Sequence, residues 1–231
     1  MIWRDLFGER KGGLERIEQH VLDMLAANRN TFELATSGLL GAADPEGLRQ
    51  QASDSDHRVN LLVQQVRREL VVHASLHGAH TEIGTMFATM SIVKDIERAG
   101  DYAKQVLRVA RVHGPLAAGT AEHAQFAAYT DRIIGHLTDV REALALHDTD
   151  EAAVIITGTR ALTDELNAAI AELLLADPAP RDGVARALAY HYLARITSHL
   201  TNVLTSLVMP LDKLDFYDED QAQTAAQAED S

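Results

Sequence analysis

Residues 92–110 read IVKDIERAGDYAKQVLRVA, and the spacing of their apolar side chains decides the fold class. Steps of three and four separate the apolar positions, which places them on one face of an α-helix. A second stretch, AYHYLARITSHLTNVLTSL at residues 189–207, lies 97 residues later and is apolar at every matching position. The matched positions are Ile92, Ile96, Ala99, Ala103, Val106 and Ala110, and Ala189, Leu193, Ile196, Leu200, Val203 and Leu207. This correspondence predicts a helical protein with an internal repeat.

Helical spacing continues through most of the chain and is interrupted by segments rich in turn and capping residues. At one of these breaks, Gly41 suits a helix C-cap, Asp44 an N-cap and Pro45 the first helical position. The breaks leave six expected helices, at 11–40, 46–75, 80–112, 120–147, 150–176 and 183–209. We therefore predict an all-α fold of two tandem three-helix bundles, because short loops make sequential helices antiparallel neighbours. The expected divisions are a first repeat at 1–113, a second at 118–211 and an acidic, disordered tail at 212–231.

The composition excludes several kinds of functional site and disfavours some classes of partner. The chain has no cysteine, which excludes disulfides, zinc–thiolate sites, iron–sulfur clusters and cysteine nucleophiles. A formal net charge of −13 disfavours nucleic acid and anionic lipid as main partners. No apolar stretch approaches the roughly 20 residues of a membrane-spanning helix, and the first residues lack the apolar core of a signal peptide. We expect a cytoplasmic protein with no membrane insertion.

Two carboxylates stand out in the third expected helix. Glu97 and Asp101 are four residues apart, so they lie on one helical face and repel each other unless a positive charge intervenes. A hard metal cation is one solution, because it prefers oxygen ligands. Ion pairs are the other, since Lys94 precedes Glu97 by three residues and Lys104 follows Asp101 by three.

The second expected helix offers a further carboxylate. If the second and third helices are antiparallel neighbours, Asp56 faces Glu97 and Asp101, which predicts a metal site made of these three residues. The Glu-x-x-His spacing of di-iron bundles is missing, which argues against a redox enzyme. Gly100 lies between the two motif carboxylates and costs roughly 1 kcal/mol in a helix, so we expect another helix or an ion to approach the backbone there.

The segment DIERAGDYA at 95–103 resembles the signature of the PhoU family, in which a Glu or Asp, three residues and an Asp lie within an "ERIGDHA"-type sequence. The segment DHRVNL at 56–61 is similar to that family's second-helix pattern of Asp, three residues, Asn and Leu. The resemblance extends in layout from about residue 14 to 210. It implies a fold of two three-helix bundles and, in some members, metal ions at the acidic motifs. Carried over by position, the metal ligands are Asp56, Glu97 and Asp101.

The same resemblance implies a regulator of phosphate uptake and of the phosphate-starvation response. Family members act by contact with phosphate transporter components and a PhoR-type histidine kinase. We expect this chain to do the same as a homodimer and without catalysis, with a divalent or iron-type metal ion at the first acidic motif. Two alternatives remain open: a carboxylate-ligated metalloenzyme or metal-storage bundle, and a helical scaffold whose acidic pairs are only solvated.

The second repeat departs from the family pattern. Ala194 and Ser198 stand where the two motif carboxylates would recur, so a second metal site is not expected. His191 and His199 are the nearest substitutes, but they lie eight residues apart with Arg195 between them. We therefore expect any ion binding to be confined to the first repeat.

Overall fold

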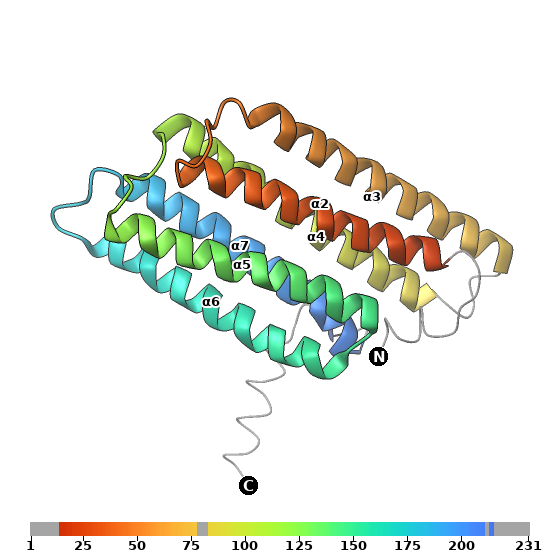
Figure 1. Cartoon of the computed structure of the whole chain (residues 1–231). Coiled ribbons are helices and arrows are strands. Elements are labelled where there is room, and N and C mark those ends of the chain that lie inside the picture. The colour runs from red at the N-terminus through yellow and green to blue at the C-terminus, as the bar shows by residue number, and fades with distance from the viewer. Residues whose placement is uncertain (1–13, 78–82, 211–212, 215–231) are drawn as a thin grey trace, which may run out of the picture.

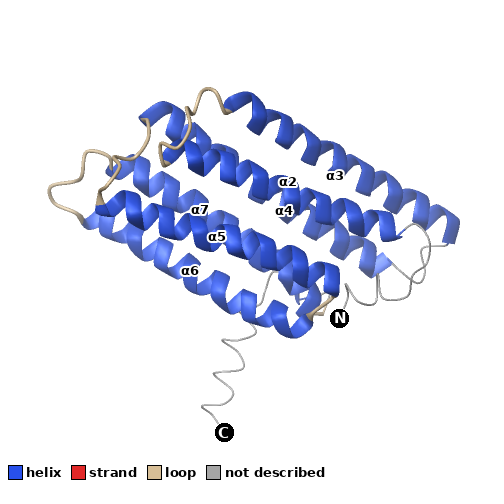
Figure 2. Cartoon of the chain, in the orientation of Figure 1, coloured by secondary structure: helices blue, strands red, loops and turns tan. Residues whose placement is uncertain are grey.

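The computed structural model describes residues 14–77, 83–210 and 213–214, and within them there are six long α-helices and no β-strand. Figure 1 shows these helices running alongside one another in an elongated bundle, and Figure 2 shows short loops joining them at its ends. The all-α prediction is confirmed. The helices are α2 (Leu14–Leu39), α3 (Arg49–His77), α4 (Ile83–His113), α5 (Ala121–Leu146), α6 (Thr149–Leu175) and α7 (Gly183–Val208).

All six helices agree with the sequence-based boundaries to within three residues. Helices α2, α3 and α4 each begin three residues later than expected, and α3 begins at Arg49 instead of residue 46. The Asp44 carboxylate accepts a hydrogen bond from the Gly47 amide at 2.9 Å. That bond is typical of an N-cap, but it closes a separate turn before the helix.

Other helix ends follow the expected local chemistry. Gly41 adopts a left-handed φ of +73° just after α2, a conformation that glycine reaches without a Cβ clash. Thr120 caps α5 by accepting a hydrogen bond from the His123 amide at 3.2 Å. The Asp148 side chain caps α6 by accepting from the Asp150 and Glu151 amides. These caps satisfy backbone donors that would otherwise have no partner within the helix.

The helices form two sequential triplets. In the first triplet α2, α3 and α4 contact one another, and in the second α5, α6 and α7 do so. Between the triplets α4 packs on α7 and α2 packs on α5, which leaves α3 and α6 at opposite edges of Figure 1. The boundaries at 1–113 and 118–211 stay a prediction. Residues 1–13 and nearly all of the 212–231 tail lie outside the described residues.

The two matched apolar sets identified in the sequence both face the interior. Every one of the twelve side chains, from Ile92 to Ala110 in α4 and from Ala189 to Leu207 in α7, is at most 2% exposed. Both sets belong to one continuous apolar core that extends through both triplets. Burial of this core drives folding and holds the two triplets together. Among the described helices, none is long and apolar enough to cross a membrane.

Candidate functional site

The predicted site residue Asp56 lies on α3 and faces α4, as the antiparallel arrangement required. It does not meet the carboxylates directly, because the Lys104 side chain lies between them. The Lys104 ammonium is 2.6 Å from an Asp56 carboxylate oxygen and 2.9 Å from an Asp101 carboxylate oxygen. Asn60 donates a further hydrogen bond to Asp56 at 3.3 Å. The ammonium therefore bridges α3 and α4 and offsets part of the negative charge of the two acids.

Glu97, the third predicted ligand, has a different partner. Lys94 contacts a Glu97 carboxylate oxygen at 2.8 Å, three residues along the same helix. Each of the three carboxylates is thus paired with a lysine of α4. The ion-pair interpretation that the sequence left open describes the observed arrangement, with Lys104 reaching across to α3 in addition.

The charge state of Lys104 is stabilised by this environment. Partial burial lowers the pKa of the Lys104 ammonium, but hydrogen bonds and attraction to Asp56 and Asp101 outweigh that cost and raise it above the usual value. The side chain is therefore positively charged at neutral pH. It supplies the cation that two facing carboxylates need.

In this structure the Lys104 ammonium occupies the place that a metal ion would take between Asp56 and Asp101. Within the described part of the chain, no three or more His, Cys, Asp and Glu side chains converge in a group that could hold one. An ion bound by Asp56 and Asp101 would occupy the place of the Lys104 ammonium, and the Glu97 carboxylate would first have to leave Lys94. Metal binding at these three residues stays a prediction that no observation here tests.

At Gly100 a side chain of α2 packs against the backbone of α4. A Cβ atom at this position would collide with the amide of Asn28, which is 2% exposed. Asn28 in turn donates a hydrogen bond to the Ile96 carbonyl. Gly100 therefore allows α2 and α4 to pack closely around a buried polar group, and no ion is needed to explain it.

A buried polar cluster joins the two triplets where α4 meets α7. His199 Nδ1 lies 2.6 Å from an Asp95 carboxylate oxygen, and Asn202 donates to the same oxygen at 3.3 Å. Asp95 and His199 are 7% and 2% exposed. Bonds to a buried carboxylate are among the stronger polar contacts in proteins, so this cluster fixes the relative position of α4 and α7.

Aromatic side chains continue the contact beside this cluster. Tyr102 of α4 stacks on His199 with ring centroids 5.6 Å apart, and on Tyr192 of α7 at 6.0 Å. Arg195 lies over the Tyr102 ring at 5.7 Å. His199 lies 97 residues after Tyr102, and Tyr192 lies 97 after Asp95, so these contacts follow the internal repeat. The Asp95–His199 pair corresponds to the Tyr192–Tyr102 pair with the two helices exchanged.

Comparison with known proteins identifies a similar domain in the first triplet and a similar fold over most of the chain. Residues 16–110 match the family model of the PhoU domain. The segment from α2 to α4 is therefore similar to a PhoU domain. The resemblance predicted from residues 56–61 and 95–103 is confirmed.

Two solved structures share the fold over most of the chain. PhoU from Pseudomonas aeruginosa matches with a TM-score of 0.69 and 22% identity, over 85% of this chain and 95% of that one. The phosphate transport system regulatory protein PhoU from Streptococcus pneumoniae matches with a TM-score of 0.63 and 18% identity, over the same shares of the two chains. No curated protein matches the sequence.

Sequence reasoning missed two contacts in this region of the structure. In the sequence, Asp95 was noted only as part of the acidic motif at 95–103. Its partner His199 was noted only as a possible replacement for a missing metal ligand in the second repeat. Their pairing had a signal, because a carboxylate among apolar neighbours needs a buried partner. The sequence signal for the contact between Asn28 and Gly100 was weaker, since only the glycine within a helix indicated that another group packs against the backbone there.

Proposed function

We propose that this protein regulates phosphate uptake and the phosphate-starvation response by direct contact with a phosphate transporter component or a PhoR-type histidine kinase. The observation that carries the proposal is the PhoU domain at residues 16–110, on the same chain whose fold matches PhoU structures over 85% of its length. One of the matching proteins, from Streptococcus pneumoniae, is a phosphate transport system regulatory protein. We further propose that the protein is cytoplasmic, forms a homodimer and acts without catalysis.

The acidic motif enters this proposal as part of the contact surface. Asp56, Lys104 and Asp101 form a charged bridge, and Asp101 keeps about half of its side-chain surface in solvent. A partner that presents a cation here would compete with Lys104. We propose that a divalent or iron-type metal ion acts in the same way, by displacing Lys104 from Asp56 and Asp101.

A gene deletion tests the regulatory function. Deletion should increase phosphate uptake and phosphatase expression in cells grown with abundant phosphate, and the intact gene should restore both to their original level. Purified full-length protein should also bind membranes that contain the phosphate transporter more strongly than membranes without it. Unchanged uptake and phosphatase expression after deletion would contradict the proposal.

A further inference from the structure

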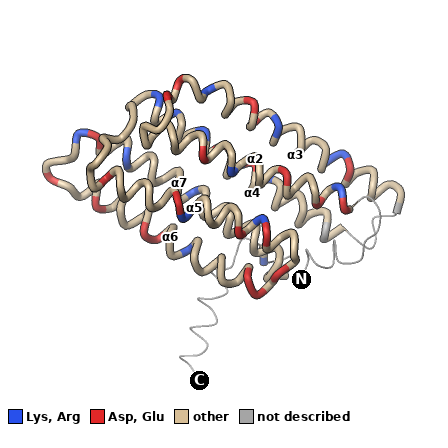
Figure 3. Tube along the Cα trace, in the orientation of Figure 1, with Lys and Arg blue, Asp and Glu red and all other residues tan. Residues whose placement is uncertain are grey.

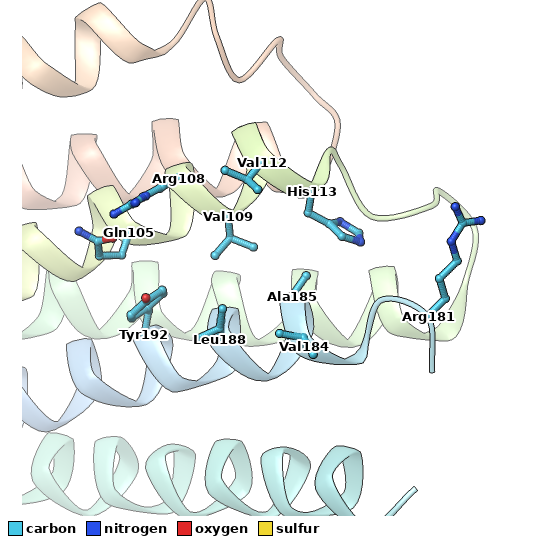
Figure 4. A pocket seen from close by; sticks show the side chains of 10 residues that line it. All are labelled: Gln105, Arg108, Val109, Val112, His113, Arg181, Val184, Ala185, Leu188 and Tyr192. Carbon is cyan, nitrogen blue, oxygen red and sulfur yellow. The ribbon is translucent and has the colours of Figure 1, made fainter. Parts of the chain in front are cut away.

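A groove between α4 and α7 lies at the end of the molecule where α4 finishes and α7 begins. Its volume is about 610 Å³. Figure 4 shows Val109 of α4 above Leu188 and Tyr192 of α7, with Arg181 at one end of the row. The remaining lining residues are Gln105, Arg108, Val112, His113, Val184 and Ala185. We call this feature the α4–α7 groove.

Part of the apolar lining of this groove is open to solvent. Val112 and Val184 are 83% and 78% exposed, and Leu188 is 43% exposed. Leu188 follows Val184 by one helical turn, so the two form a continuous apolar strip along α7. Apolar side chains grouped in this way gain free energy when another apolar surface covers them.

The titratable side chains that line the groove are basic, apart from the Tyr192 phenol. Arg108, Arg181 and His113 line it, and none of its lining residues is acidic. Within the described residues, neither arginine forms an ion pair, whereas nearby Asp182 pairs with Arg186 at 3.2 Å. This basic rim contrasts with the chain as a whole, whose net charge is −13, and with the mixed charges along the helices in Figure 3.

We propose that the α4–α7 groove binds an amphipathic helix of another protein that carries an apolar stripe flanked by Asp and Glu. Two neighbouring helices present a furrow that suits a third helix, with apolar anchors at i, i+3 or i+4, and i+7. Val184 and Leu188 contact the stripe, and Arg108 and Arg181 contact the acids. The inference rests on the proposed function in one respect: the helix belongs to a protein that this chain regulates.

The groove also has a place in the internal repeat. Gln105 and Tyr192 line it, and the residues that correspond to them through the 97-residue repeat are Asn202 and Asp95. At that opposite end of the α4–α7 contact the same two positions join through a hydrogen bond to a buried carboxylate. One end of the contact is thus closed by polar bonds within the chain, and the other end leaves an apolar furrow for a partner.

Binding of two synthetic peptides to the full-length chain tests the proposal. Both labelled peptides are about 18 residues long, or five helical turns, with identical leucines at helical spacing. One has glutamates beside the leucines and the other has lysines. The glutamate peptide should bind about tenfold more tightly in about 0.1 M salt, and the preference should shrink at higher salt. Equal binding of the two peptides would overturn the proposal.

Variants locate the binding surface. Val184→Glu and Arg181→Glu change exposed side chains, so each should leave the fold intact while weakening the glutamate peptide about tenfold. The matched control is Val71→Glu, at a 64% exposed valine in a separate apolar groove between α3 and α4. Loss of binding in the control variant, or unchanged binding in the groove variants, would overturn the assignment.

Displacement of the glutamate peptide by a peptide of residues 212–231 would overturn the proposal in favour of this chain's own tail. Failure of the gene-deletion test with intact peptide binding would reject the regulatory function alone.

Discussion

Helices α4 and α7 occupy equivalent places in the two triplets, yet different side chains hold them to their neighbours. In the first triplet Lys104 connects α4 to α3 through Asp56, with Nζ 2.6 Å from the carboxylate. In the second triplet Thr201 stands 97 residues after Lys104, and its hydroxyl is 2.7 Å from the Thr159 hydroxyl of α6. At this position the first triplet has an ammonium between two carboxylates, whereas the second triplet has a pair of buried hydroxyls.

The same contrast recurs along the two helices. Gly100 corresponds to Thr197, whose hydroxyl lies 2.7 Å from that of Thr163 on α6. The contact of α6 with α7 is more extensive than that of α3 with α4. The comparison teaches that a repeated apolar stripe preserves the bundle while the polar contacts diverge. In the first triplet those contacts are charged and partly open to solvent, which suits a surface that responds to other charged groups.

The largest expected effect lies at the buried pair between the triplets. Asp95→Ala should lower the free energy of unfolding by about 3 kcal/mol, because it leaves the buried His199 and the partly buried Asn202 without the carboxylate they bind. Tyr192→Phe is the matched change at the corresponding position of α7 and should stay within about 0.5 kcal/mol of the wild type. Urea unfolding of both variants measures the difference. A cost below about 1 kcal/mol for Asp95→Ala would show that this pair does not fix the contact of α4 with α7.

Glycine substitutions test the close packing of the first triplet. Gly100→Ala should destabilise the protein by about 2 kcal/mol, since the added methyl group collides with buried Asn28. The matched control is Gly135→Ala on α5, where a Cβ would meet no atom within 4 Å. That change should stabilise the protein by about 1 kcal/mol through helix propensity alone. If thermal unfolding shows both substitutions to be stabilising, α2 and α4 pack less closely at Gly100 than described.

The two polar bridges should differ mainly in their response to salt. Lys104→Met and Thr201→Val should each cost about 1 kcal/mol in unfolding free energy in dilute buffer. The cost of Lys104→Met should fall in about 1 M salt because its ion pairs are partly exposed and therefore screened. The cost of Thr201→Val should not change, since its hydroxyl pair is neutral and buried. Equal salt dependence would remove the distinction between the two triplets.

The lysine variant also tests metal binding at the predicted ligands. If a divalent cation such as Mn²⁺ binds Asp56 and Asp101, it must displace Lys104, so it should raise the melting temperature of Lys104→Met more than that of the wild type. The added change Asp56→Asn should abolish this gain. Equal stabilisation of the wild type and Lys104→Met would show that the lysine does not compete with the ion.

The smallest expected effect is a pH dependence in the second triplet. Burial lowers the pKa of His136, and its neighbour Arg132 lowers it further, while Asp139 opposes both. The folded protein therefore holds fewer protons than the unfolded chain, so this contribution to stability is complete above the unfolded pKa and is lost as the pH falls below it. His136→Gln should flatten the fall in unfolding free energy between about pH 7 and pH 5. The exposed His191→Gln is the control, and an equal flattening there would contradict the assignment.

Much of the site's local chemistry followed from spacing. The lysines three residues from Glu97 and Asp101 offered ion pairs within α4 as one of the two interpretations of the acidic motif, and both pairs are present. The reach of Lys104 to Asp56 did not follow, because it depends on how far α3 and α4 slide along each other. The pairing of Asp95 with His199 depends likewise on the contact between triplets, which no short segment specifies.

The sequence by itself determined the six helices, their buried faces and the kinship of the two triplets. It could do so because the 3.6-residue period fixes which side chains share a face, whatever the helix packs against. Only the tertiary structure decided that a lysine separates the predicted ligands, that Asn28 explains Gly100, and that a basic apolar groove opens at one end of the contact between α4 and α7. Each of these depends on the offset and orientation of neighbouring helices, which are set by the packing of the whole core.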